Sequence, residues 1–233
     1  MSKSILFLEK PQVKVAVRKV RNSTRLSLRV SSINESVTLT APVSTNQDVL
    51  LRFLESKENW IKENLLKISD KKVNVDIGHL IPIFGTKKHI EICSESLNVR
   101  IIGNSIRIPT TVAKPGLAIE NFLKKLAKEE TTRVANYYCG KLGVSYASIK
   151  LRDTRSRWGS CSSNSNLMFS WRIIMAPRNI IRYLVAHEVT HLKHFNHSRE
   201  FWFEVRSIFG SYENERNWLR TEGTNLHFYK FNG

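Results

Sequence analysis

The sequence predicts an α+β protein with a β-rich N-terminal region over residues 1–112 and a more helical C-terminal region over residues 113–233. Three observations lead to this fold class. Apolar and polar residues alternate in short segments before residue 112, apolar residues recur at helical spacing after it, and the segment TTVAKPG between the regions carries a Pro-Gly break. A hydrophobic content of 41% over 233 residues is enough for a core.

Alternating residues predict three strands close to the N-terminus. The strands lie in VKVAVRKV, RLSLRV and VTLT, between Val13 and Thr40, and we expect antiparallel pairing. The polar linker SSINES is short enough for a hairpin between the last two. A helix of about 24 residues should follow, with Thr45 and Asp48 as a capping pair. Its apolar stripe would contain Leu50, Leu54, Ile61 and Leu65.

The chain then returns to strand-like segments, which are LIPIFG, KKHIEI, LNVRII and SIRIP. Gly103 and Asn104 separate the last two segments and predict a two-residue hairpin, because glycine adopts the positive φ that such turns need. After the Pro-Gly break, a long helix is predicted from about Leu117 to Leu142. We expect this helix to pack behind the helix that carries the motif described below.

Two further strands are predicted before that helix, near Ala147 to Leu151 and in LMFSWRII, and the loop DTRSRWGSCSSNSN joins them. Tryptophan followed by glycine and small polar residues is unusual in a plain turn. The loop therefore either lines a substrate cleft or is pinned to the core, and its candidate cleft residues are Arg157, Trp158, Gly159, Ser160 and Cys161. The thiol could in principle be a nucleophile or a metal ligand, but we favour a structural or cleft-lining role because a metal motif is already complete elsewhere.

The stretch from Tyr183 to Trp202, YLVAHEVTHLKHFNHSREFW, contains the motif HExxH as His187, Glu188 and His191. Residues four apart in a helix lie one turn apart on the same face, so both imidazoles can bind one cation. Preceding apolar residues predict a buried helix that starts close after Pro177. Two histidines and a glutamate on a buried face would be costly without a partner such as a metal.

The end of this helix predicts the third ligand. We expect the helix to end near His194 to Asn196, because asparagine tolerates the left-handed conformation that closes helices, and Ser198 can cap the next helix. The chain then turns, and His197 can face back towards the metal. His194 is a rival ligand, but it lies about two turns from His187 along one helix.

Two questions about the site stay open in the sequence. Glu213 or Glu215 would be the third ligand if a later helix completed the site. Tyr212 and Arg157 are both candidate donors of a hydrogen bond to an oxyanion, although nothing in the sequence places either of them at the metal.

The predicted cofactor is one Zn²⁺ ion per chain, bound by His187, His191 and His197. Three neutral imidazoles on a zinc ion allow the pKa of a bound water to fall towards about 7. Glu188 would take the proton of this water as general base and pass it to the leaving amine. The predicted substrate is a peptide or protein.

The composition indicates which partners and which cellular compartment to expect. Lysine and arginine total 37 against 20 acidic residues, a net charge of +17 that permits binding to nucleic acid, although no basic run reaches five residues. The three cysteines, Cys93, Cys139 and Cys161, form neither a disulfide framework nor a CxxC site. The N-terminus has too few consecutive apolar residues for a signal peptide, and no apolar run could cross a bilayer. We therefore expect a cytoplasmic protein without a membrane partner.

The combination of RSRWGSCSS, a short strand, AP and YLVAHEVTHLKHFNHSREFW resembles the YgjP-like metallopeptidases, which are similar to the SprT and WLM groups of zincins. The segments RLSLRV, KENWIKENLL and LIPIFGTKKHIEI also look like the leader region of that family, so the resemblance covers nearly the whole chain. It implies a zincin-like C-terminal domain with zinc metalloendopeptidase activity, the three histidines named above as ligands and Glu188 as base. The wider metzincin pattern has glycine where this chain has His194, so a standard metzincin turn is not implied.

Two alternatives stay open, of which the first concerns the substrate of the peptidase and the second belongs to a different functional class. Relatives in the SprT and WLM groups include proteases that cut proteins crosslinked to DNA, and a basic surface would suit such work through phosphate contacts. A non-enzymatic nucleic-acid-binding protein with a structural zinc site is the second alternative. Glu188 distinguishes the two classes, because a structural zinc site needs no carboxylate beside an open coordination position.

Overall fold

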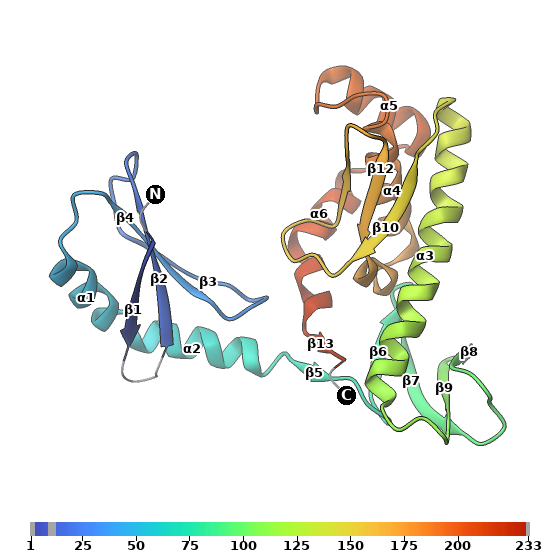
Figure 1. Ribbon diagram of the computed structural model, residues 1–233, viewed down its shortest axis with the longest axis horizontal. Helices are drawn as coiled ribbons and strands as arrows, with labels where there is room; N and C mark the ends of the chain where they lie inside the picture. Colours follow the sequence, from blue (N-terminus) through green and yellow to red (C-terminus); the bar gives the residue numbers. More distant parts are fainter. Residues whose placement is uncertain (1–2, 9–12, 232–233) are drawn as a thin grey trace. The chain divides into compact units, whose positions relative to one another are not determined.

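The computed structural model describes residues 3–8 and 13–231, which form two compact units divided between Lys72 and Val73. Each unit has its own hydrophobic core. Figure 1 shows the helices and strands of both units. The division differs from the boundary expected at residue 112. Within the described residues, no helix combines the length and the apolar character needed to cross a membrane.

The first unit contains a four-stranded sheet with the strand order β1-β2-β4-β3. Its strands are β1 (Lys3–Leu8), β2 (Val13–Val20), β3 (Ser27–Val30) and β4 (Val37–Pro42). The predicted β3–β4 hairpin is confirmed, with Val30 opposite Val37 in an antiparallel ladder. The prediction of antiparallel pairing throughout is wrong, because β2 and β4 are parallel. The chain passes from β2 to the sheet edge at β3 before it returns in β4, and this crossover aligns β4 with β2.

Two helices, α1 (Gln47–Ser56) and α2 (Glu58–Ser69), replace the single helix predicted here. Lys57 interrupts the helical path with φ −110° and ψ 6°, and its N–H donates to the carbonyl of Leu54, three residues earlier. The N-terminal cap is Asn46 rather than Thr45, because its side chain accepts from the N–H of Gln47. The predicted apolar stripe still forms the core, where Leu50, Leu54 and Ile61 are buried.

The second unit begins with a sheet of order β6-β7-β9-β8. Its strands are β6 (Leu80–Ile83), β7 (Thr86–Cys93), β8 (Arg100–Ile102) and β9 (Ser105–Pro109). The predicted hairpin at Gly103 is confirmed, with φ 57° at the glycine and Ile102 opposite Ser105. The buried isoleucines of this sheet belong to the same core as α3 (Pro115–Leu142). This shared core explains why the structure divides before the sheet rather than after it.

The β6–β7 turn ties this sheet to the helix that carries HExxH. The N–H groups of Phe84 and Gly85 donate to the carbonyls of Ile174 and Met175 at 2.9 and 3.2 Å. A Cβ on Gly85 would lie 3.0 Å from Pro177, which immediately precedes α4 (Arg178–Thr190). Gly85 also has φ 80°, so both its conformation and its close approach to the proline favour glycine.

A three-stranded sheet of order β10-β12-β11 lies in the same unit as α3 and α4, and α3 packs behind α4 as predicted (Figure 1). The strands are β10 (Ser148–Arg152), β11 (Gly159–Cys161) and β12 (Asn166–Ser170). The strand predicted over LMFSWRII ends at Ser170, and a 3-10 helix η1 (Trp171–Met175) follows. All five residues of η1 are buried, so they lack the two-sided alternation of an amphipathic strand.

The C-terminal part of the unit is helical except for one short strand pair. Its elements are α5 (Arg199–Phe209), α6 (Glu213–Thr221), η2 (Gly223–His227) and β13 (Tyr229–Lys230), which pairs in parallel with β5 (Val73–Asn74). The motif helix α4 ends at Thr190, earlier than the predicted end near His194 to Asn196. A tighter turn of the 3-10 type follows, because the N–H groups of Leu192 and Lys193 donate to carbonyls three residues earlier.

Candidate metal centre

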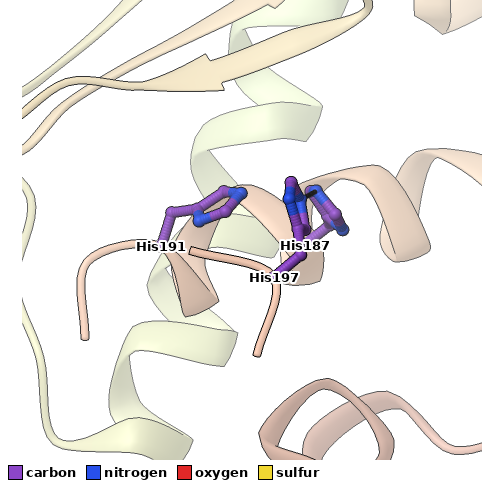
Figure 2. A group of neighbouring side chains, drawn as sticks. All are labelled: His187, His191 and His197. Carbon is purple, nitrogen blue, oxygen red and sulfur yellow. Dashed lines mark hydrogen bonds between the residues drawn. The ribbon is translucent and has the colours of Figure 1, made fainter. Parts of the chain in front are cut away.

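The end of α4 and the turn after it bring His187, His191 and His197 together. One ring nitrogen from each of these histidines lies within 4.8 Å of the others. The Nε2 atoms of His187 and His197 are 3.1 Å apart, and Figure 2 shows their rings side by side with the ring of His191 pointing towards them. Two nitrogens bound tetrahedrally to one zinc ion lie about 3.3 Å apart, so this spacing fits a shared metal.

The protonation of the histidines also suits metal binding. Burial, together with the neighbouring His191 and His197, lowers the pKa of His187 to about 3, and burial lowers the pKa of His191 as well. Both imidazoles are therefore neutral at neutral pH and keep a lone pair. The Nδ1 of His191 lies 2.9 Å from the carbonyl oxygen of His194, which can only accept, so Nδ1 carries the proton and Nε2 is free to bind.

The side chain of Phe201 forms a wall shared by the three rings. This residue is fully buried on α5, and its ring centroid lies 4.9, 4.5 and 4.8 Å from those of His187, His191 and His197. The α5 helix begins as predicted, because the hydroxyl of Ser198 accepts from the N–H of Phe201. The cap and the buried phenylalanine fix the turn that carries His197.

Glu188 follows His187 on α4 and is 6% exposed. Burial raises the pKa of its carboxyl to about 8, while the positive charge of Arg157 opposes this increase. The carboxylate packs directly against Gly159 of β11, where an added Cβ would lie 2.5 Å from Oε1 and 2.6 Å from Cγ. Glycine at this position therefore leaves room for the Glu188 side chain.

A hollow of about 520 Å³ opens beside these residues. Trp158 and Gly159 line it together with His187, Glu188 and His197, so part of the loop expected at the cleft lies there. The Trp158 indole packs against the His227 ring, with 5.1 Å between the ring centroids, and against Gly223. Its neighbours in the loop are placed differently: Ser160 and Cys161 are half-buried in β11, and Arg157 is exposed.

The thiol of Cys161 is a poor nucleophile in this setting. Burial, with the charge of Glu188, raises its pKa to about 11, so little thiolate is present at neutral pH. The cysteine also lies outside the group of histidines that could hold a metal among the described residues.

The remaining residues that line the hollow were not predicted from the sequence to lie at a cleft. They are Tyr183, Leu184, Trp202, Arg216, Leu219 and Arg220. The two arginines stand four residues apart on α6, a spacing that places them on one face of a helix. This spacing was the one available signal, but only the packing of α6 beside α4 shows that the face borders the histidines.

The alternative ligands lie in other interactions. His194 Nε2 is 3.2 Å from Glu204 Oε2. Glu213 accepts from Arg206 at 2.6 Å, and Glu215 accepts from Asn179 at 2.9 Å. None of these three residues belongs to the group that could hold a metal among the described residues.

The candidate oxyanion donor Tyr212 is part of an aromatic stack. Its buried ring is stacked between Trp202, at 5.0 Å and 22°, and Tyr183, at 5.8 Å and 11°. The ring therefore supports the tryptophan that lines the hollow.

Comparisons with known proteins place this chain in a family. The family model described as YgjP-like, metallopeptidase domain, matches residues 24–222. No curated protein matches significantly. Similar solved structures are the metallopeptidase zymogens abylysin of Pyrococcus abyssi and jannalysin of Methanocaldococcus jannaschii. Abylysin is 18% identical to this chain with a TM-score of 0.35, and the match covers 40% of this chain and 95% of abylysin. Jannalysin is 21% identical with a TM-score of 0.34, and the match covers 40% of this chain and 91% of jannalysin. Since the family model spans most of the chain, this protein belongs to the YgjP-like metallopeptidase family.

Proposed function

We propose that this metallopeptidase is a zinc enzyme with a zincin-like C-terminal region that hydrolyses internal peptide bonds of a peptide or protein. His187, His191 and His197 would hold the zinc ion, and Glu188 would be the general base. The observation that carries the proposal is the convergence of three imidazoles beside a buried carboxylate at the wall of an open hollow.

A bound zinc ion supplies Lewis-acid chemistry, which lowers the pKa of water and polarises a carbonyl group. Glu188 accepts a proton from the attacking water as the new C–O bond forms, and donates it to the nitrogen as the C–N bond breaks. Burial raises the pKa of this carboxyl above its ordinary value, which makes its carboxylate a stronger base for the proton of the water. Gly159 keeps the space in which this carboxylate sits.

The variant Glu188→Gln tests this mechanism. We expect it to keep one zinc ion per chain and to lose at least about a hundredfold in hydrolysis of unfolded casein, because the amide cannot accept the proton. Metal content and peptide release are the two measurements. Glu129→Gln, an exposed position on α3, is the matched control and should leave both unchanged. Undiminished hydrolysis by Glu188→Gln would remove the mechanism.

Nucleic acid is a second proposed partner, supported by the net charge of +17. Such a charge favours salt-sensitive contacts with phosphates. If the enzyme acts on DNA-bound proteins, DNA should stimulate cleavage of a DNA-bound substrate, and the stimulation should decrease with salt. A protein that bound zinc and DNA but hydrolysed no substrate would instead support the non-enzymatic alternative.

We also propose a cytoplasmic location. Cys93, Cys139 and Cys161 are all free thiols, as expected in a reducing compartment. Fractionation of cells that produce the tagged protein tests this location directly.

A further inference from the structure

One wall of the hollow carries two arginines whose role the hydrolysis scheme leaves open. Arg216 and Arg220 stand one turn apart on α6, and both line the hollow together with His187, Glu188 and His197. Two arginines therefore border the space in which the scissile bond would have to lie.

Arg216 is held in a defined position. Its guanidinium carbon lies 4.8 Å from the centroid of the Trp202 ring, a cation–π distance. The Trp202 ring in turn stacks on His197 at 5.5 Å and 24°. The positive charge of Arg216 is thus linked to the proposed metal ligand His197 through the Trp202 ring, which contacts both.

Among the described residues, no carboxylate lies within ion-pair distance of either Arg216 or Arg220. Arg220 donates one hydrogen bond, from Nη2 to Oδ1 of Asn217 at 2.8 Å. The first two acids of α6 have other partners, since Glu213 pairs with Arg206 and Glu215 accepts from Asn179. Most guanidinium donors of the pair therefore remain available.

The rest of the wall does not supply a second acid. Glu188 is the one carboxylate among the residues that line the hollow, and it is buried against Gly159. The other lining side chains include the apolar Trp158, Leu184 and Leu219. A planar guanidinium matches a carboxylate in both charge and geometry, and it binds this group more strongly than a neutral amide.

We propose that Arg216 and Arg220 form a carboxylate-binding subsite beside the histidine cluster, so that preferred peptides carry a carboxylate close to the scissile bond. The inference rests on the proposed function and names the substrate class. The carboxylate has two sources, an aspartate or glutamate side chain within the peptide or the α-carboxylate at its C-terminus. An acidic side chain would favour internal cleavage, and an α-carboxylate would favour removal of C-terminal residues.

Binding to the zinc-loaded Glu188→Gln protein tests the subsite without turnover. Four fluorescein-labelled alanine-rich peptides would be compared by fluorescence anisotropy, with a central Glu or Gln and with a free or amidated C-terminus. We expect a peptide with the preferred carboxylate to bind about tenfold more tightly than its neutral counterpart, and less so at high salt. The Glu/Gln pair and the free/amidated pair separate the two sources of the carboxylate.

Arginine variants in the same background assign the effect to the two residues. Arg216→Gln and Arg220→Gln should each reduce the preference for the carboxylate, and Arg216→Lys should restore part of it because it keeps the charge. Arg182→Gln, which removes a charge from an exposed position on α4 outside the hollow, is the matched control and should have no effect. Zinc content measured for each variant reveals any indirect change through Trp202 and His197.

The outcomes separate this inference from the proposed function. Equal binding of all four peptides, or a preference that survives loss of both arginines, overturns the subsite even if the wild-type enzyme hydrolyses peptides. An arginine-dependent preference supports the subsite, and it does so even if the wild-type protein hydrolyses none of the four peptides. In that last case, the proposed function would need revision while the subsite would stand.

Discussion

Gly159 and Glu188 are in direct contact, although they lie on different elements of the second unit. A Cβ on Gly159 would come within 2.5 Å of the Glu188 Oε1, closer than real Cβ atoms approach a carboxylate. The glycine of the WGSC segment therefore leaves the space that the Glu188 side chain occupies.

The substitution Gly159→Ala should displace the Glu188 side chain and lower hydrolysis by at least about a hundredfold. Zinc content should stay unchanged, because the added methyl group meets the carboxylate rather than the histidines. Gly140→Ala on α3 is the control, since nothing lies within 4 Å of its added Cβ. Normal activity of Gly159→Ala would show that the carboxylate can move without consequence.

Phe201→Ala should loosen the histidine cluster, because the ring contacts all three imidazoles. We expect a loss of about 3–5 kcal/mol in the free energy of unfolding and a zinc affinity weakened about tenfold or more. Thermal unfolding and competition with a chelator measure the two effects. Phe203→Ala, on the same helix but 76% exposed, should change neither. A variant with wild-type zinc affinity would contradict the proposed wall.

Removal of zinc should abolish hydrolysis and lower the melting temperature, because the ion binds the folded state and not the separated histidines. The secondary structure should persist in circular dichroism, since the main hydrophobic core of this unit is built from apolar side chains that do not bind the metal. Added zinc should restore activity, whereas magnesium should not, because magnesium prefers oxygen ligands. Hydrolysis that continues in excess chelator would exclude a catalytic metal.

Glu130 predicts a pH-dependent contribution to stability. Its nearly buried carboxylate on α3 accepts from Arg133 at 2.8 Å and from Arg178 of α4 at 3.1 Å. The hydrogen bond from Arg133 lowers the pKa of Glu130, against the opposing effect of burial. Because the folded-state pKa lies below the unfolded value of about 4.3, the stabilisation is complete above that value and is lost as the pH falls through the folded-state pKa.

We therefore expect Glu130→Gln to cost about 1.5 kcal/mol of unfolding free energy at pH 7. The difference from wild type should shrink as the pH falls below about 4. Urea unfolding followed by tryptophan fluorescence reports on the second unit, which contains Trp158, Trp171, Trp202 and Trp218. The adjacent exposed Glu129→Gln should show no such pH dependence. A difference that stays constant with pH would contradict the ion-pair explanation.

The sequence by itself determined the features that depend on local spacing. Three features depend only on neighbours a few residues away, so each could be predicted and located. They are the four-residue interval between His187 and His191, the hairpin glycine at position 103 and the helix cap at Ser198. The family resemblance rested on motifs of the same local kind, and the family model supports it over residues 24–222.

Only the tertiary structure decided the features that depend on packing between distant segments. The sheet over residues 80–109 joins the second unit because its buried isoleucines share a core with α3, and alternation alone cannot reveal this shared core. The parallel pairing of β2 with β4 depends on which strand occupies the sheet edge. Two features of the site also depend on packing, because each joins residues from separate elements. They are the contact of Gly159 with Glu188 and the position of Arg216 beside the histidines. Burial and charge act through space rather than along the chain, so local spacing cannot reveal such contacts.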